Sequence, residues 1–144
     1  MEKQIFEQLQ EELYVEQMDN GLSVYILPKP GFNKTYATFT TKYGSIDNHF
    51  KEPGAAEYSR VPDGIAHFLE HKLFEKEDGD VFQQFSRQGA AANAFTSFTR
   101  TAYLFSSTTD VEKNLETLID FVQEPYFSDQ SVEKEKGIIG QEIM

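Results

Sequence analysis

The sequence contains no cysteine among its 144 residues and few basic side chains: 13 lysines and arginines stand against 24 aspartates and glutamates. Without cysteine, disulfide bonds and thiolate metal ligands are excluded, so a metal site has to use histidine, carboxylate or water. The net charge of −11 leaves no basic face to neutralise phosphates, which argues against nucleic acid as a partner. The chain is nevertheless expected to fold, because 39% of its residues are hydrophobic.

Long apolar runs and linker-like stretches are missing as well. No apolar run approaches membrane-spanning length, and residues 1–8 lack the apolar core of a secretory signal, which predicts a cytoplasmic protein without a membrane segment. No repeat or Pro/Gly-rich linker divides the chain, so we expect a single domain over residues 1–144. The helical pattern of residues 128–144 ends without Gly, Asn or Pro, which predicts an N-terminal fragment of a longer protein.

The residue patterns predict a mixture of helices and strands. Asn20-Gly21 between two apolar runs is typical of a hairpin turn, and Pro125 is expected to end the helix before it. The expected helices are 3–12, 64–74, 80–88, 110–123 and 128–144, and the expected strands are 14–18, 22–27, 34–43, 91–97 and 100–107. A long loop, 44–63, is expected to precede the second helix. The predicted fold class is α+β, with helices packed on one face of a mostly antiparallel sheet.

The most informative motif is His67-x-x-Glu70-His71, within the stretch 64–74 that we expect to be helical after an Asp63 cap. Positions i, i+3 and i+4 of a helix lie on one side, so two imidazoles can bind one cation while the carboxylate reaches water bound to it. The helical repeat of about 100° per residue places these residues opposite the apolar Ile65, Phe68, Leu69 and Leu73. The motif therefore predicts a zinc peptidase site facing a cleft.

Catalytic zinc usually has three protein ligands, so the two histidines require a third. The last expected helix offers Glu133, Glu135 and Glu142, and the last two lie within about 20° of each other around a helix. One carboxylate could bind the metal while another accepts a hydrogen bond from the free nitrogen of a ligating imidazole. Residue spacing alone leaves open which glutamate has which role.

Three segments occur in the order found in a known family: Gly64-Ile-Ala-His-Phe-Leu-Glu-His-Lys-Leu-Phe74, then Asn93-Ala-Phe-Thr96, then Glu135-Lys-Gly-Ile-Ile-Gly-Gln-Glu142. Together they resemble the insulinase (pitrilysin-like) zinc metallopeptidases, a group that includes the mitochondrial processing peptidases. The resemblance covers residues from about 20 to 144 and looks closest to bacterial members. Because the zinc motif has the inverted order, these enzymes are also called inverzincins.

The resemblance implies a role for each motif residue. His67, His71 and Glu142 would bind one Zn²⁺ per chain, Glu70 would be the general base, and Glu135 would support a ligand. An edge strand would bind the peptide substrate through its backbone. The matching residues are Ala92, Asn93, Ala94 and Phe95. Asn93 has a simpler alternative, which is to satisfy backbone groups at a strand end. For His49, which lies in the polar loop, we expect only solvent exposure.

The resemblance also implies that this chain is the truncated first unit of a clamshell made of two homologous halves. A missing C-terminal half or a homologous subunit would complete the chamber, and we expect little peptidase activity from the isolated chain. The alternative function is a non-catalytic peptide-binding or assembly subunit of an insulinase-like complex. Such a subunit has no need to keep two histidines, Glu70 and an acidic third ligand together, so the sequence favours a zinc-dependent metalloendopeptidase.

Overall fold

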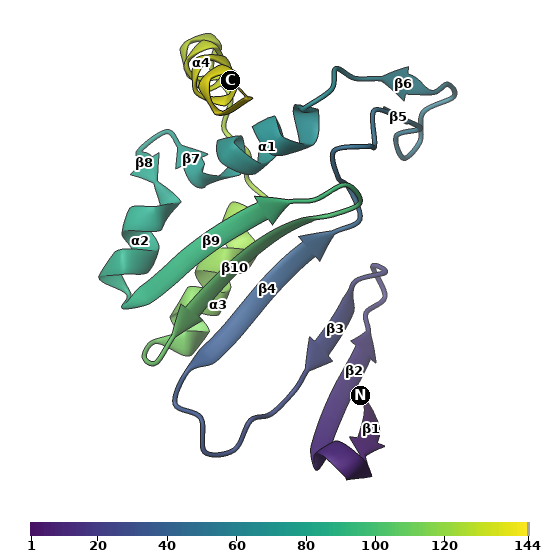
Figure 1. Cartoon of the computed structure of the whole chain (residues 1–144), viewed down its shortest axis with the longest axis vertical. Coiled ribbons are helices and arrows are strands. Elements are labelled where there is room, and N and C mark those ends of the chain that lie inside the picture. The colour runs from purple at the N-terminus through teal and green to yellow at the C-terminus, as the bar shows by residue number, and fades with distance from the viewer. Residues whose placement is uncertain (144) are drawn as a thin grey trace. The chain divides into compact units, whose positions relative to one another are not determined.

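The computed structural model describes residues 1–143, and the chain divides into two compact units, Met1–Asn33 and Lys34–Met144. Figure 1 labels the helices and strands of both units. No helix among the described residues is long and apolar enough to cross a membrane. The assignment of residues 1–144 to a single domain stays a prediction.

The first unit is an antiparallel sheet in the order β1 (Glu2–Phe6), β2 (Glu11–Gln17) and β3 (Ser23–Ile26), with a short 3-10 turn at Glu7–Leu9. The hairpin at Asn20-Gly21 is confirmed: Gly21 has a φ of 89°, and the Asn20 side chain accepts a hydrogen bond from the Leu22 amide at 3.0 Å. The predicted helix over residues 3–12 is wrong. Its first half is β1, whose backbone pairs with β2 from Glu2 opposite Val15 to Phe6 opposite Glu11. Pairing with a distant strand outweighs local helix propensity here.

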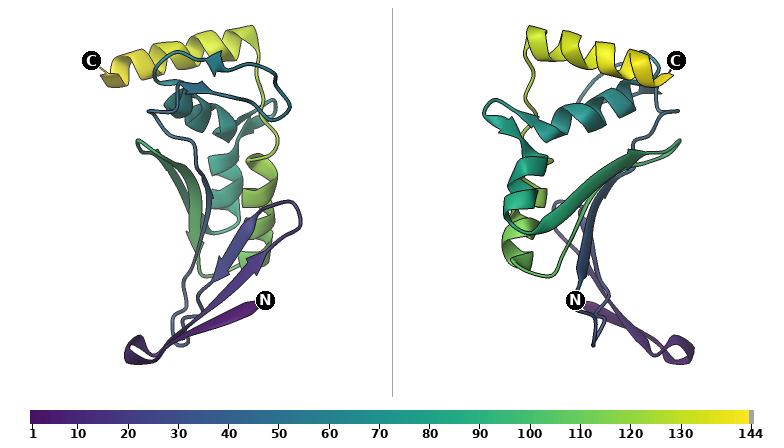
Figure 2. Two further views of the ribbon diagram at one scale, coloured as in Figure 1. Left: turned by 90° about the vertical axis from the view of Figure 1, so that its right-hand side faces the viewer. Right: turned by 60° about the vertical axis from the view of Figure 1, so that its left-hand side comes forward.

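The second unit is built on an antiparallel sheet in the order β4 (Thr35–Thr41), β10 (Thr101–Ser107) and β9 (Ala90–Thr96). Helices α2 (Val81–Arg87) and α3 (Val111–Phe121) cover one face of it (Figure 2). The core between them consists of buried apolar side chains: Phe74, Val81, Phe85, Ala90, Tyr103, Phe105, Leu118 and Phe121. The predicted α+β class, a mostly antiparallel sheet with helices on one face, is confirmed.

Two further helices lie beyond one end of this sheet, α1 (Ile65–Phe74) and α4 (Asp129–Ile143). They contact each other, and α1 also contacts β9 and β10. Two short ladders complete the unit, β5 (His49–Phe50) with β6 (Ser59–Arg60), and β7 (Glu75–Lys76) with β8 (Gly79–Asp80). The predicted loop 44–63 thus contains β5 and β6. Segments far apart in the sequence meet where α1, α4 and β9 converge.

Gly44 allows the chain after β4 to pack against the turn between β9 and β10. The amides of Ser45 and Ile46 donate to the carbonyls of Ser97 and Phe98 at 2.9 and 3.1 Å. A Cβ atom on residue 44 would lie 2.5 Å from backbone atoms of Phe98 and Arg100, which cannot move aside as a flexible side chain could. The lack of a side chain at this position is therefore required by the close approach of two backbone segments.

Gly44→Ala is accordingly expected to lower the free energy of unfolding by about 1–3 kcal/mol, the usual cost of overpacking. Gly137→Ala, inside α4, is the matched control, because its Cβ would meet no described atom within 4 Å. The control is expected to stabilise the chain by about 0.5–1 kcal/mol, since alanine favours a helix. Urea unfolding measures both, and a Gly44→Ala chain as stable as the parent would contradict the prediction.

Candidate metal centre

Helix α1 carries the motif residues and begins differently from our expectation. Its N-cap is Gly64, with a φ of 86°, and among the described residues no side chain caps the helix. The expected cap, Asp63, instead accepts a hydrogen bond from the side-chain amide (Nδ2) of Asn48 at 2.8 Å. The left-handed conformation at Gly64 favours glycine, and it turns the chain into the helix. Asp63 therefore organises the preceding loop.

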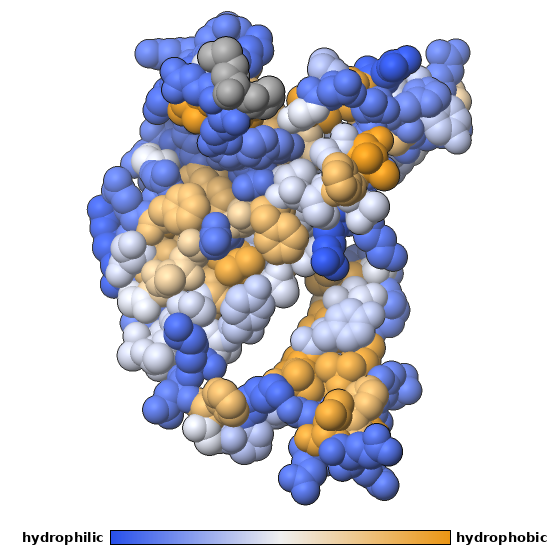
Figure 3. Space-filling view, viewed as in Figure 1, coloured by the Kyte–Doolittle hydropathy of each residue, from blue (hydrophilic) through white to orange (hydrophobic). Residues whose placement is uncertain are grey.

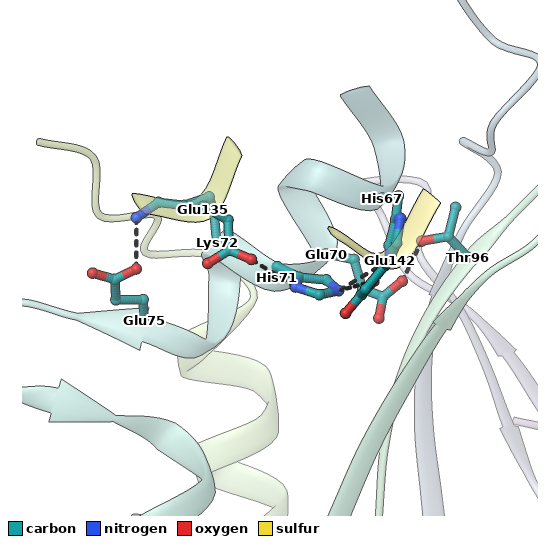
Figure 4. A network of polar contacts seen from close by, with 8 residues as sticks. All are labelled: His67, Glu70, His71, Lys72, Glu75, Thr96, Glu135 and Glu142. Atoms are coloured by element: carbon teal, nitrogen blue, oxygen red, sulfur yellow. Dashed lines mark hydrogen bonds and ion pairs between the residues drawn. The ribbon is translucent and has the colours of Figure 1, made fainter. Parts of the chain in front are cut away.

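His67, His71 and Glu142 converge on one point (Figure 4). The Nε2 atoms of the two histidines are 3.0 Å apart, and the Glu142 Oε2 atom lies 3.3 Å from the first and 3.7 Å from the second. One turn of α1 supplies both imidazoles, and the C-terminal part of α4 supplies the carboxylate. The structure thus brings together the three residues for which the family resemblance implied metal ligation.

Glu135 lies two turns before Glu142 on the same face of α4 and contacts the other ring nitrogen of His71. Its Oε1 atom is 2.7 Å from the His71 Nδ1 atom, and its side chain is only 9% exposed. A carboxylate there accepts the Nδ1 hydrogen, which leaves the Nε2 lone pair facing His67 and Glu142. The third glutamate that the sequence left open, Glu133, is exposed and pairs with Lys136 at 2.6 Å. Glu133 is therefore not part of this cluster.

The donor set and its spacing fit zinc. Tetrahedral zinc with ligand distances of about 2.0–2.1 Å has ligand-to-ligand edges of roughly 3.3 Å. The three separations of 3.0, 3.3 and 3.7 Å are close to that value. Two imidazoles and one carboxylate are also a donor set used by catalytic zinc sites, which keep a further position open. His49 is exposed in β5, as predicted, and takes no part in the cluster.

Glu70 is buried on the side of α1 that packs against β9. It is 9% exposed, and its Oε2 atom accepts a hydrogen bond from the Thr96 hydroxyl at the end of β9. Glu70 and His71 line a pocket, as expected for the chemical face of α1, but burial does not follow the apolar face. The buried residues of the helix are Ala66, Glu70, Lys72 and Phe74, whereas Ile65, Phe68, Leu69 and Leu73 are only partly buried. A single-face pattern assumes one neighbour, and α1 has α4 on one side and the sheet on another.

Tyr103 of β10 belongs to the buried apolar core and is close enough to Glu70 to be affected by its charge. Burial, and next the negative charge of Glu70, raise the pKa of the Tyr103 hydroxyl far above its ordinary value. Its ring packs edge-on against Phe121 with centroids 5.7 Å apart. The tyrosine is therefore uncharged at neutral pH.

The expected substrate strand lies at the edge of its sheet within the described residues, because β9 pairs with β10 on one side only. Ala92 and Ala94 pack towards the core, whereas Asn93 and Phe95 are exposed. Apolar surface is visible over this sheet in Figure 3. The Asn93 side chain accepts a hydrogen bond from the neighbouring Ala94 amide at 2.9 Å. This contact is with the backbone, but Asn93 lies in the middle of β9 and not at a strand end.

A pocket of about 660 Å³ connects these features. Glu70, His71 and Glu135 line it, as do Asn93 and Ala94 of β9. His71 of the metal cluster, Glu70 and the edge strand thus face a common space within the second unit. Sequence reasoning assigned no role to Thr96, although it follows Ala92 and Ala94 on the same face of the strand.

Comparisons with known proteins agree with this geometry. The model of the insulinase family, peptidase family M16, matches residues 44–144. The zinc protease YmfH of Bacillus subtilis strain 168 is 78% identical over 138 residues, which is 96% of this chain and 32% of that protein. The crystal structure of an M16-like peptidase from Alicyclobacillus acidocaldarius matches with a TM-score of 0.86 and 49% identity, over 92% of this chain and 31% of that one.

Pitrilysin has the same fold over 97% of this chain and 14% of its own length, with a TM-score of 0.75 at 21% identity. The chain thus spans about a third of the length of YmfH and of the Alicyclobacillus peptidase. The family model covers well over half of the chain, including every residue of the metal cluster. The chain therefore belongs to the insulinase family, peptidase family M16.

Proposed function

We propose that the protein is a zinc-dependent metalloendopeptidase and that this chain supplies the metal-binding part of its active site. The observation that carries the proposal is the convergence of His67, His71 and Glu142 within 4.8 Å of one another. These residues would hold one Zn²⁺ per chain. The chemistry that zinc supplies in such sites is polarisation of a carbonyl oxygen and a lower pKa for water.

Glu70 is the proposed general base and general acid. It lines the same pocket as His71, and its carboxylate can take a proton from the attacking water and return it to the leaving amine. The Thr96 hydroxyl donates to one carboxylate oxygen, Oε2, and so holds the side chain in one orientation. The remaining oxygen is the one we assign to proton transfer.

Peptide substrate is proposed to bind along β9 at Ala92, Asn93, Ala94 and Phe95. An edge strand has unpaired backbone groups, so an extended peptide can add to the sheet through main-chain hydrogen bonds. Such pairing tolerates varied side chains, which suits a peptidase acting on many sequences. Asn93 and Ala94 line the pocket beside Glu70, which supports binding of the scissile bond near the base.

The remaining part of the substrate-binding chamber is proposed to come from a part of the protein outside this chain or from another subunit. The chain spans 32% of the length of YmfH, and we propose that it is the N-terminal part of a two-half peptidase, completed by a C-terminal half or a homologous subunit. We further propose that the protein acts in the cytoplasm. The complete set of two histidines, base and acidic ligand favours catalysis over a purely binding role.

The test of the proposed centre is zinc binding by the chain and by two glutamine variants of α4. Glu142→Gln removes the carboxylate charge from the cluster and is expected to weaken zinc binding by at least about tenfold, because a neutral amide is a poorer ligand. Glu133→Gln, on an exposed face of the same helix, is the control and should bind zinc like the parent. Competition with a chromogenic chelator measures affinity, and metal analysis measures stoichiometry. Equal affinity in both variants would remove Glu142 from the site.

A further inference from the structure

Lys72 follows His71 directly in α1 and is fully buried. Its ammonium group donates to the Ser131 hydroxyl at 2.7 Å and to the Glu75 Oε2 atom at 2.9 Å. The rings of Tyr126 and Phe127, in the segment between α3 and α4, each lie 5.9 Å from the Nζ atom. The side chain therefore connects α1 with the first turn of α4 and with the segment leading into it.

A charged group in this position is not needed to fill space. Burying an ammonium group is costly, and an apolar side chain of similar volume often stabilises a protein equally well or better. The charge instead fixes the relative positions of the packed segments, because a buried ammonium group requires hydrogen-bond acceptors at defined positions around it. Ser131 is buried on α4, so the contact specifies where that helix lies along α1.

The position of α4 in turn determines the metal cluster. Ser131, Glu135 and Glu142 are four and seven residues apart, so they lie within about 40° of one another around the helix. Glu135 contacts the Nδ1 atom of His71, and Glu142 faces the two Nε2 atoms. A helix is rigid over this length, so a shift at Ser131 moves both carboxylates relative to the histidines. Figure 4 shows the contact of Lys72 with Glu75 and, farther along α1, the contacts of His71 with Glu135 and Glu142.

We propose that Lys72 is a positioning residue for the metal centre: its buried ammonium group anchors α4 on α1 so that Glu135 and Glu142 meet His71 and His67. This inference rests on the metal site of the proposed function. Lys72 would touch neither metal nor substrate. It would act through α4, the helix that carries Glu135 and Glu142.

The decisive variant is Lys72→Met, which keeps the volume and removes the charge. Ser131 retains its hydrogen bonds to Ser128, and Glu75 is partly exposed, so no buried group loses all its partners. We therefore expect unchanged stability in urea, a fall of about tenfold in zinc affinity, and an altered visible spectrum of bound Co²⁺, which reports coordination geometry. A merely structural role predicts lower stability with the same affinity and spectrum.

Asn114→Ala is the control for loss of a buried polar contact. Asn114 is fully buried in α3 and bonded to Gln88 and to the Thr109 carbonyl, away from α4. This variant should lose stability while keeping the zinc affinity and the Co²⁺ spectrum of the parent. It separates damage to the fold from displacement of α4.

Ser131→Ala removes the contact between Lys72 and Ser131 from the side of α4. It tests the role of Lys72 even if Lys72→Met does not fold. Its control is Ser128→Ala, which removes the hydroxyl that accepts from the Ser131 amide at 3.1 Å and leaves Lys72 untouched. Weaker zinc binding in Ser131→Ala but not in Ser128→Ala supports the inference. If the Lys72 and Ser131 variants had the zinc affinity and Co²⁺ spectrum of the parent, the role of Lys72 would be wrong while the proposed metal centre would stand. If the parent chain bound no zinc, the proposed metal centre would be wrong as well.

Discussion

Replacing His71 with alanine is expected to abolish stoichiometric zinc binding by the chain. His71 has both ring nitrogens engaged, Nε2 towards His67 and Glu142, and Nδ1 on Glu135. The substitution removes a ligand and also the hydrogen-bond donor that Glu135 requires. Since loss of an outer hydrogen-bond partner alone costs about 10–100-fold in metal affinity, loss of the ligand should cost at least about a hundredfold.

The matched control for this prediction is His49→Ala, which removes an exposed histidine of β5. Metal analysis of the purified chains should find one zinc in the parent and in the His49 variant, and none in the His71 variant. Urea unfolding should show an additional loss of stability in His71→Ala, because the buried Glu135 carboxylate loses its partner. Full zinc occupancy in His71→Ala would disprove the assigned centre.

Glu70→Gln is expected to retain zinc and to lose peptide hydrolysis in the full-length protein. Glutamine has nearly the same shape and can still accept the hydrogen bond from Thr96, but it cannot take a proton from water. The loss of a positioned general base corresponds to a fall in kcat of about 10²–10⁴. The measurement is hydrolysis of a fluorogenic peptide, together with metal analysis of the same preparation.

Glu116→Gln is the control for the change of charge, since Glu116 is exposed on α3. It should have the activity and the zinc content of the parent. If Glu70→Gln turned over peptide at the parental rate, Glu70 would not be the base. If Glu70→Gln lost zinc, its carboxylate would have to be assigned to metal binding instead.

The parts of the fold that could be predicted are those whose signal is local. The Asn20-Gly21 hairpin and the helix expected before Pro125, which is α3, each depend on neighbouring residues. Residues 3–12 show the limit of this approach. They favour a helix locally, but residues 2–6 form a strand because β2 lies beside them and satisfies their backbone.

The same limit applies to burial around α1. The helical repeat separates the apolar Ile65 and Phe68 from the motif residues, but the buried residues of α1 include the polar Glu70 and Lys72. Both polar residues have partners far away in the sequence, Thr96 for Glu70 and Ser131 for Lys72. A pattern within one helix contains no information on such partners, so neither Thr96 nor Lys72 was given a role.

The sequence by itself determined that His67, Glu70 and His71 lie on one side of a helix, because a spacing of three and four residues makes them neighbours on any α-helix. It also determined that any further ligand had to be histidine, a carboxylate or water in a chain without cysteine. Only the tertiary structure decided where the glutamates lie, with Glu142 facing the two Nε2 atoms, Glu135 on Nδ1 and Glu133 in solvent. The physical reason is that these contacts span more than sixty residues of sequence and depend on how α4 packs against α1.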